Sequence, residues 1–334
     1  MSKKVVIDGE HLKIEDIAAV VADSSVTVEI AESALAKCKK SEEYLASSLN
    51  GKIVYGINTG FGPMASHVIN NGQLEQLQEN LIRSHAVGMG DALPTEYVLA
   101  AMMVRLNTLA RGYSGISRAL LDRLVFFINN RIIPIVPEHG AVGTSGDLVQ
   151  LAHIALALLG EGDVVYKGER QPAGKVLAAL SAPTNYKLKI KEGLALINGT
   201  SMMSGIAALE VTKAEHLFET AVYNGALAME MVHAFFDGVS EDLHALRAHI
   251  GQVAVAKKLR DIFASSKLLR SRKVLKSQAE FEEEVHKLPE SVQEIYSLRC
   301  IPQILGPVHD ALAHARKIIS VEINSVTDNP VIDA

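Results

Sequence analysis

The chain has 334 residues and a formal net charge of −5, and 48% of its residues are hydrophobic. This length allows one large domain or two smaller ones, each with a buried core. Because charges of both signs are mixed along the chain, we expect no basic surface for nucleic acid.

The cysteine content and the N-terminal residues indicate the compartment. Cys38 and Cys300 are the only cysteines, too few for a disulfide framework, and they form no CxxC motif. Residues 1–6 lack the apolar core of a signal peptide, and no apolar run reaches the length of a membrane span. We therefore expect a soluble, cytoplasmic protein in a reducing compartment.

The N-terminal part of the sequence predicts two short strands, a helix and a loop. Runs typical of strands occupy residues 4–7 and 20–28, and apolar residues at helical spacing follow over 28–48. The glycine-rich segment 51–63 is too interrupted for a helix and too long for a simple turn. Loops of this kind tend to carry function.

Helical patterns dominate the rest of the sequence. Gly160 is placed to close one helix at its C-terminus, and residues 164–171 predict a hairpin. The stretch 200–236 is apolar on most sides, so we expect it to be buried among other helices. The expected helices span residues 74–87, 96–110, 116–130, 147–159, 200–236, 250–263 and 302–326. Neither a repeat nor a linker interrupts them, so we expect residues 1–334 to form a single, mainly α-helical domain.

The loop at residues 143–148, Gly-Thr-Ser-Gly-Asp-Leu, can perform unusual chemistry on its own backbone. Glycine has no Cβ, so the chain can turn sharply there and its amide nitrogen can approach other groups. Attack of the Gly146 nitrogen on the Thr144 carbonyl would close a five-membered ring. Loss of water, including the Ser145 hydroxyl, would then leave an exocyclic methylidene. Such an electrophile would act as a built-in cofactor.

Taken alone, this loop is more simply a turn followed by a helix N-cap. Three further motifs occur in the same chain: residues 54–62 (Val-Tyr-Gly-Ile-Asn-Thr-Gly-Phe-Gly), 197–200 (Ile-Asn-Gly-Thr) and 296–300 (Tyr-Ser-Leu-Arg-Cys). With Arg-Ser-His at residues 83–85, the set resembles the aromatic amino acid ammonia-lyase and 2,3-aminomutase family. The resemblance covers nearly the whole chain from about residue 54.

This resemblance implies a mainly α, elongated helical bundle with a small α/β N-terminal part, as in ammonia-lyases and fumarase-aspartase-like proteins. It also implies a 4-methylidene-imidazol-5-one (MIO) electrophile formed from Thr144, Ser145 and Gly146, with no metal and no nucleotide. The family usually has Ala where this chain has Thr144. That side chain lies outside the ring, so we expect ring closure to survive, and the difference leaves the point to be tested. Leu148 matches the position whose backbone amide lies near the ring, where the N–H groups of a helix N-terminus stabilise negative charge.

Elimination of ammonia also requires a base beside the β-carbon of the substrate, because the β-proton is barely acidic. By resemblance, Tyr55 takes this proton. Phenol is largely protonated at neutral pH, so nearby cations or hydrogen-bond donors to its oxygen are needed. Gly60 and Gly62 permit close approach of the backbone to the substrate. Without the family pattern, Tyr55 would be interpreted as a packed loop aromatic.

The remaining matched positions would hold the substrate. Asn198 matches a residue that the family places near the ring and the substrate. Arg299 resembles the clamp for the substrate carboxylate, since guanidinium offers two parallel donors. Tyr296 and Gln293, on the same segment, would support the substrate. The simpler interpretations are a turn for Asn198 and an ordinary ion pair for Arg299.

His85, with Ser84, stands where the family distinguishes its substrates. A polar pair argues against a purely apolar pocket for phenylalanine, because buried polar groups need partners. A structural histidine is the simpler interpretation of His85. Taken together, the motifs favour tyrosine as the substrate, with histidine next. The other histidines show no metal-ligand spacing and HExxH is absent, so we expect no metal.

Several alternatives stay open. The same motifs fit an aromatic 2,3-aminomutase, which returns ammonia to the β-carbon, and a non-catalytic helical scaffold fits a chain of this length. Family members continue with further helices, so we expect this chain to be the N-terminal two-thirds of a longer family chain, with poor turnover alone. The resemblance also implies a homotetramer with shared active sites and an aromatic amino acid as substrate, without nucleic acid or membrane partners.

Overall fold

The structure is a computed structural model that describes residues 3–49, 52–272 and 291–334. Two compact units make up the chain: Met1–Glu210 with Ile318–Ala334, and Val211–Lys317. The expectation that residues 1–334 form one lyase domain stays a prediction. The division into two units describes only how contacts group within this chain. In the described ranges, no helix combines the length and the apolar character needed to cross a membrane.

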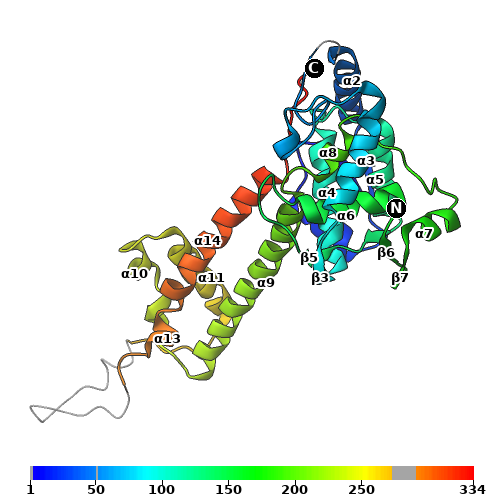
Figure 1. Ribbon diagram of the computed structural model, residues 1–334. Coiled ribbons are helices and arrows are strands. Elements are labelled where there is room, and N and C mark those ends of the chain that lie inside the picture. Colours follow the sequence, from blue (N-terminus) through cyan, green and yellow to red (C-terminus); the bar gives the residue numbers. More distant parts are fainter. Residues whose placement is uncertain (1–2, 50–51, 273–290) are drawn as a thin grey trace, which may run out of the picture. The chain divides into compact units, whose positions relative to one another are not determined.

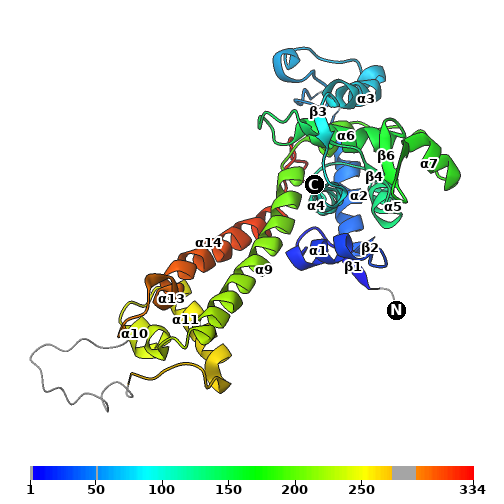
Figure 2. The ribbon, with the colours of Figure 1, turned by 90° about the horizontal axis from the view of Figure 1, so that it is seen from below.

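The first unit is built around helix α4 (Thr95–Ala110). Every residue of α4 from Val98 to Ala110 is buried, which is the pattern of a helix surrounded by others. It packs against α1 (Ile14–Ala22), α2 (Glu32–Ser48) and α5 (Arg118–Asn129) (Figures 1 and 2). The other helices of this unit are α3 (Leu74–His85), α6 (Leu148–Leu159), α7 (Ala173–Ala179), α8 (Glu192–Ile197) and the short 3-10 turns η1 (Gly62–Met64) and η2 (Asn71–Gln73).

Three small sheets complete the first unit. Strands β1 (Lys4–Ile7) and β2 (Thr27–Ile30) pair in parallel, and β3 (Met89–Ala92) and β5 (Pro137–His139) pair antiparallel. The third sheet has the order β4 (Ile133–Pro134), β6 (Asp163–Tyr166) and β7 (Glu169–Pro172). The antiparallel pairing of β6 with β7 confirms the predicted hairpin.

The strand expected at residues 20–28 is wrong for its first half. Helix α1 extends to Ala22, and β2 begins only at Thr27. Val20 suggested a strand because it is β-branched. In the fold it shares the buried face of α1 with Ile14 and Ile17, at helical spacing. Burial of this face outweighs the local preference.

The second unit contains the later part of α9 (Ser201–Met231), α10 (Glu241–Ala245), α11 (Ile250–Ile262), α13 (Tyr296–Arg299), most of α14 (Ile301–Glu322) and the 3-10 turns η3 (Phe236–Val239) and η4 (Phe263–Ser265). Helices α9 and α14 run side by side here (Figures 1 and 2). Close packing of α11 and α14 depends on a glycine, since a Cβ at Gly251 would lie 2.1 Å from the Gly306 oxygen. The core includes Val222, Met229 and Leu259.

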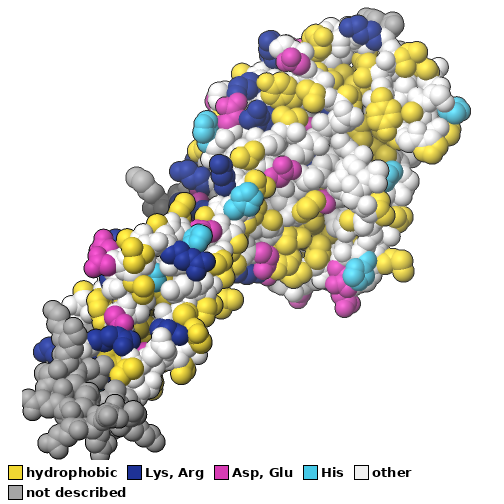
Figure 3. Space-filling view, turned by 90° about the vertical axis from the view of Figure 1, so that its left-hand side faces the viewer, with side chains coloured by type: hydrophobic (Ala, Val, Ile, Leu, Met, Phe, Trp, Pro, Cys, Tyr) yellow, Lys and Arg dark blue, Asp and Glu magenta, His cyan; other side chains and the backbone are white. Residues whose placement is uncertain are grey.

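Helix α9 is less buried than its composition predicts. Met203, Leu217 and Met231 are 56%, 71% and 72% exposed in the single chain. Figure 3 shows hydrophobic side chains distributed over the face of the molecule that it draws. The expectation that residues 200–236 are buried among helices is therefore not met by the contacts of one chain.

Candidate active site

The loop that precedes α6 has an unusual backbone. Its φ angle is positive at Gly143 (78°), Ser145 (63°) and Gly146 (86°). Glycine adopts this region freely, but a serine there is strained by about 1–2 kcal/mol. Such a conformation persists only where the surrounding structure enforces it. The strain falls on the serine that was predicted to form the electrophile.

Gly199 holds this loop through two backbone hydrogen bonds. Its N–H donates to the Ser145 oxygen at 3.1 Å, and its own oxygen accepts from the Asp147 N–H at 2.8 Å. A Cβ at Gly146 would lie 2.1 Å from the Gly199 oxygen. Only glycine therefore allows these two segments to approach so closely.

A second donor reaches the same oxygen from Asn198. The side-chain Nδ2 of Asn198 lies 3.4 Å from the Ser145 oxygen, a longer contact than the one from Gly199. The Asn198 Oδ1 accepts from the backbone N–H of Asn329 at 2.8 Å, which fixes the direction of the amide. Two N–H groups thus point at the Ser145 oxygen, an arrangement that stabilises negative charge there.

Asp147 anchors the end of the loop to the start of α9. Its Oδ2 accepts from the Met203 N–H at 2.9 Å, and the residue is 7% exposed. Burial raises the pKa of the Asp147 carboxyl, partly offset by donors from Met202 and Met203. The side chains of Thr144 and Ser145 are exposed. The backbone of the loop is therefore held by hydrogen bonds, while the side chains predicted to form the electrophile are exposed to solvent.

Helix α8 connects the predicted parts of the site within the first unit. It packs against α3, which ends at His85, and against α6, which begins at Leu148. A Cβ at Gly56, in the loop of Tyr55, would lie 2.7 Å from the Leu194 side chain of α8. The sequence pattern did not predict α8, because six residues are too few to show a helical period.

Tyr55 receives a hydrogen bond of the kind that a base requires. The backbone N–H of Gly62 donates to the Tyr55 phenol oxygen at 3.3 Å, and Gly62 has a φ of 52°. The Tyr55 ring packs edge-on against Phe61, with centroids 6.5 Å apart, and the side chain is 44% exposed.

His85 has one ring nitrogen engaged and the other available. Its Nδ1 lies 2.9 Å from the Leu81 carbonyl oxygen and 3.1 Å from the Ser84 hydroxyl. A carbonyl only accepts, so this contact assigns the proton to Nδ1 in the neutral ring. The Nε2 atom is then an acceptor.

The remaining predicted residues belong to the second unit. Gln293 and Arg299 line a cavity of about 310 Å³, and the Arg299 guanidinium lies 4.2 Å from the centroid of the Tyr296 ring. The Arg299 Nε is buried and has no hydrogen-bond partner among the residues that the structure describes. Tyr296 is 71% exposed. Gln293, Tyr296 and Arg299 therefore lie together in the second unit. The other predicted site residues lie in the first unit, around α8.

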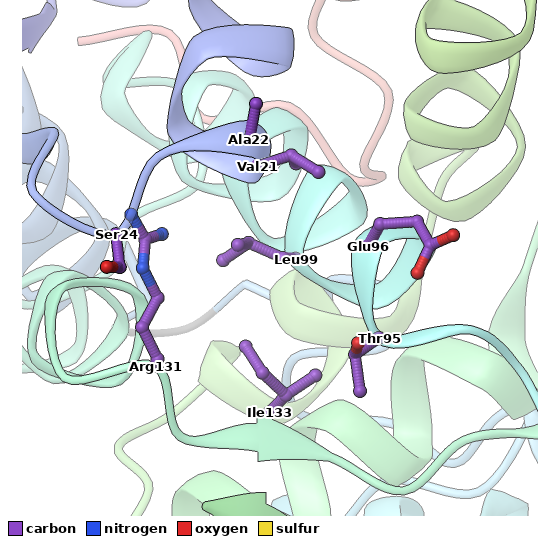
Figure 4. Close-up of a pocket in the computed structure, with 8 residues that line it drawn as sticks. All are labelled: Val21, Ala22, Ser24, Thr95, Glu96, Leu99, Arg131 and Ile133. Carbon is purple, nitrogen blue, oxygen red and sulfur yellow. The ribbon is translucent and has the colours of Figure 1, made fainter. Parts of the chain in front are cut away.

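A separate cavity of about 370 Å³ lies in the first unit, lined by α1, α4 and the residues after α5 (Figure 4). None of the predicted site residues lines it. Its Arg131 directs Nη2 to the carbonyl oxygens of Asp23 and Val26, at 2.8 and 3.1 Å. These bonds hold the turn between α1 and β2, so we assign Arg131 a structural role.

No cluster of three metal-ligating side chains occurs among the residues that the structure describes.

Comparison with known proteins identifies relatives over almost the whole chain. The model of the family described as aromatic amino acid lyase matches residues 12–334. Histidine ammonia-lyase of Caldanaerobacter subterraneus subsp. tengcongensis is 39% identical over 331 residues, which cover 99% of this chain and 62% of that protein. A probable histidine ammonia-lyase of Thermoplasma volcanium is 42% identical over 331 residues, with 98% and 63% covered.

Solved structures give the same fold. Tyrosine aminomutase from Streptomyces globisporus matches with a TM-score of 0.93 and 35% identity, covering 99% of this chain and 63% of that one. Histidine ammonia-lyase from Trypanosoma cruzi matches with a TM-score of 0.84 and 32% identity, covering 98% and 58%. These matches confirm the predicted mainly α fold. The chain spans about three fifths of the length of the curated relatives that it matches.

Proposed function

Because this chain belongs to the aromatic amino acid lyase family, we propose that the protein eliminates ammonia from an aromatic L-amino acid to give the trans-acrylate. The observation that carries this proposal is the pair of hydrogen bonds that Asn198 and Gly199 donate to the carbonyl oxygen of the strained Ser145. A turn that only reverses the chain does not need two N–H donors on one carbonyl oxygen.

The residues of this loop fit the MIO group. Closing the Gly146 nitrogen onto the Thr144 carbonyl leaves the Ser145 carbonyl inside the ring, so the two donors described above address the ring oxygen. When formed, the group supplies an electrophile that converts the substrate amine into a better leaving group. The N-terminal N–H groups of α6, which begins at Leu148, add positive partial charge close to the loop.

Tyr55 is the proposed base for the β-proton. Its side chain is 44% exposed and its oxygen accepts from the Gly62 N–H, so the same N–H can hold this oxygen in place before and after proton transfer. Gly62 has no heavy atom within 4 Å of the position of a Cβ, which leaves space for a substrate beside the tyrosine.

Arg299 is the proposed carboxylate clamp, with Tyr296 and Gln293 beside it. Its Nε lacks a partner among the described residues, and its guanidinium stacks on Tyr296, which holds the plane of the donors. We propose a homotetramer in which one subunit supplies these residues to the site of another, as the resemblance implies.

The sequence motifs favoured tyrosine as the substrate, but the named sequence relatives are histidine ammonia-lyases. We therefore place L-histidine first and L-tyrosine second. His85 suits both, because its Nε2 accepts a hydrogen bond either from an imidazole N–H or from a phenol O–H. L-phenylalanine offers neither donor and would leave this acceptor unpaired.

The test is to incubate purified protein separately with L-histidine, L-tyrosine and L-phenylalanine and to follow the absorbance of the conjugated acrylates. The expected result is product from histidine, removed by Ser145→Ala. Product from tyrosine alone would reverse the order of substrates. Absence of any acrylate from a protein whose intact mass shows complete dehydration would refute the lyase proposal.

A 2,3-aminomutase is the second candidate, since tyrosine aminomutase is a structural neighbour with a TM-score of 0.93. Both activities need the same ring, base and clamp. Amino acid analysis of the same reactions separates them, because only the mutase yields a β-amino acid.

A further inference from the structure

We propose that Arg105 increases the electrophilic character of the ring-forming loop by acting through a single peptide unit. This inference deepens the proposed function and rests on it. Arg105 lies in the middle of α4, is 1% exposed and belongs to none of the sequence motifs. Its role is that of a positioning residue, since its hydrogen bonds to described residues go to carbonyl oxygens outside the loop.

The contacts form a continuous series. The Nη1 of Arg105 donates to the carbonyl oxygen of Asn198 at 2.8 Å. That carbonyl shares its peptide unit with the N–H of Gly199, and the two groups point in opposite directions across the planar trans bond. The Gly199 N–H donates to the Ser145 oxygen at 3.1 Å. A positive charge at one end of this peptide therefore acts on the hydrogen bond at its other end.

Hydrogen bonds arranged in series polarise one another, and they do so more strongly in a medium of low dielectric constant. A guanidinium on the Asn198 carbonyl makes the Gly199 N–H a stronger donor. The Ser145 oxygen is the ring oxygen after closure, and it is conjugated with the methylidene carbon. Any donor strengthened toward this oxygen draws electrons from the methylidene carbon, which makes that carbon more reactive to nucleophiles.

Among the described residues, no carboxylate forms an ion pair with Arg105. Its hydrogen bonds within the described part of the chain are to the carbonyl oxygens of Asn198 and Ala195. Burial lowers the pKa of Arg105 to about 10, with Asp328 and Asp147 opposing the shift, so it remains protonated at neutral pH. Asp328 is itself paired with buried Lys191 at 2.6 Å.

A merely structural role for Arg105 would be to satisfy the last carbonyls of α8, of which Ala195 is one. That role requires hydrogen bonds to two carbonyls, whereas the proposal requires the charge. Two substitutions separate them. Arg105→Lys keeps the charge but not the fork of donors, and Arg105→Gln keeps a donor without the charge.

The experiment measures the ring rather than turnover. For wild type, R105K and R105Q, intact mass reports loss of water at residues 144–146, and circular dichroism reports folding. Each protein is then mixed with 2-mercaptoethanol. The thiolate sulfur bonds to the methylidene carbon, the C=C electron pair shifts toward the ring oxygen, and a proton is taken from solvent. Loss of the ring absorbance, with Ser145→Ala as the blank, gives the rate.

We expect R105Q to react about tenfold more slowly than wild type, less than the loss of a whole oxyanion donor. R105K should react close to the wild-type rate. A ring that forms in R105K but not in R105Q would also support the proposal. R105Q as fast as wild type, or R105K as slow as R105Q, would overturn it.

If R105Q does not fold, R105K decides alone. A rate near wild type supports the proposal, and a tenfold loss overturns it. If the wild-type protein shows neither dehydration nor ring absorbance, the proposed function itself is refuted. That result is distinct from a failure of the Arg105 proposal, which requires a ring that forms.

Discussion

Alanine at Gly146 should be far more damaging than alanine at Gly143, although both glycines have left-handed backbones. Their φ angles are 86° and 78°. An L-residue pays about 1–2 kcal/mol in this region at either position. At Gly146 the new Cβ would also lie 2.1 Å from the Gly199 oxygen and 2.4 Å from its carbonyl carbon, both backbone atoms. At Gly143 no heavy atom of the described residues lies within 4 Å of the position of the new Cβ.

To relieve this clash the two segments must separate, and the two hydrogen bonds of Gly199, at 2.8 and 3.1 Å, are lost. Each contributes about 1 kcal/mol. We therefore expect Gly146→Ala to lower the free energy of unfolding by about 3–4 kcal/mol, and Gly143→Ala by about 1–2 kcal/mol. Both changes belong in a Ser145→Ala background, so that ring formation does not alter the comparison.

Urea unfolding followed by circular dichroism gives both values, provided that the slope with urea is unchanged. In the Ser145 background, intact mass should show that dehydration is lost at Gly146→Ala and kept at Gly143→Ala. Equal destabilisation by the two substitutions, within about 0.5 kcal/mol, would refute the close approach of Gly146 and Gly199.

Three further predictions concern single side chains. Tyr55→Phe should reduce the elimination rate by about 100-fold or more while intact mass shows a complete ring, because only the proposed base is removed; unchanged turnover would exclude Tyr55 as the base. The side chains of Lys191 and Asp328 are 0% exposed, and the Lys191 Nζ lies 2.6 Å from the Asp328 Oδ2. Removing either partner should lower the free energy of unfolding, measured in urea, by about 3–5 kcal/mol. A decrease below about 1 kcal/mol would count against a buried charge. Burial lowers the pKa of His153, whose Nε2 accepts from the Gly88 N–H at 3.0 Å. The unfolded chain then binds the extra proton, so stability should fall as the pH drops below about 6.5, and should fall less in His153→Gln.

Local signals were sufficient where a residue acts within its own segment. Residues 148–159 are apolar and end at Gly160, and α6 ends there with Gly160 at φ 93°. Glycine is the residue that adopts this conformation without strain, so sequence alone placed the end of the helix. The hairpin of β6 and β7 was predictable for the same reason, from Lys167 and Gly168, which have φ angles of 53° and 81°.

Residues that act across the sequence were not predictable in this way. Arg105 lies in a helix that is buried from Val98 to Ala110, and its partners are the carbonyls of Ala195 and Asn198, 90 and 93 residues later. Every residue has a backbone carbonyl oxygen, whatever its side chain. The sequence pattern therefore could not indicate which carbonyls an arginine would bind. Helix α8 was missed as well, since all six of its residues are buried and show no alternation of polar and apolar positions.

The order of events in making the proposed electrophile is inferred from these distances along the chain. Asn198, which reaches the Ser145 oxygen, follows that residue by 53 positions. In an unfolded chain nothing compensates the left-handed conformation of Ser145, and closure of so long a loop carries its own entropic cost. Folding of α4 and α8 must therefore come first, since they bring Asn198 and Gly199 to the loop. The backbone chemistry at Ser145 is then expected only in protein that has already reached its native state.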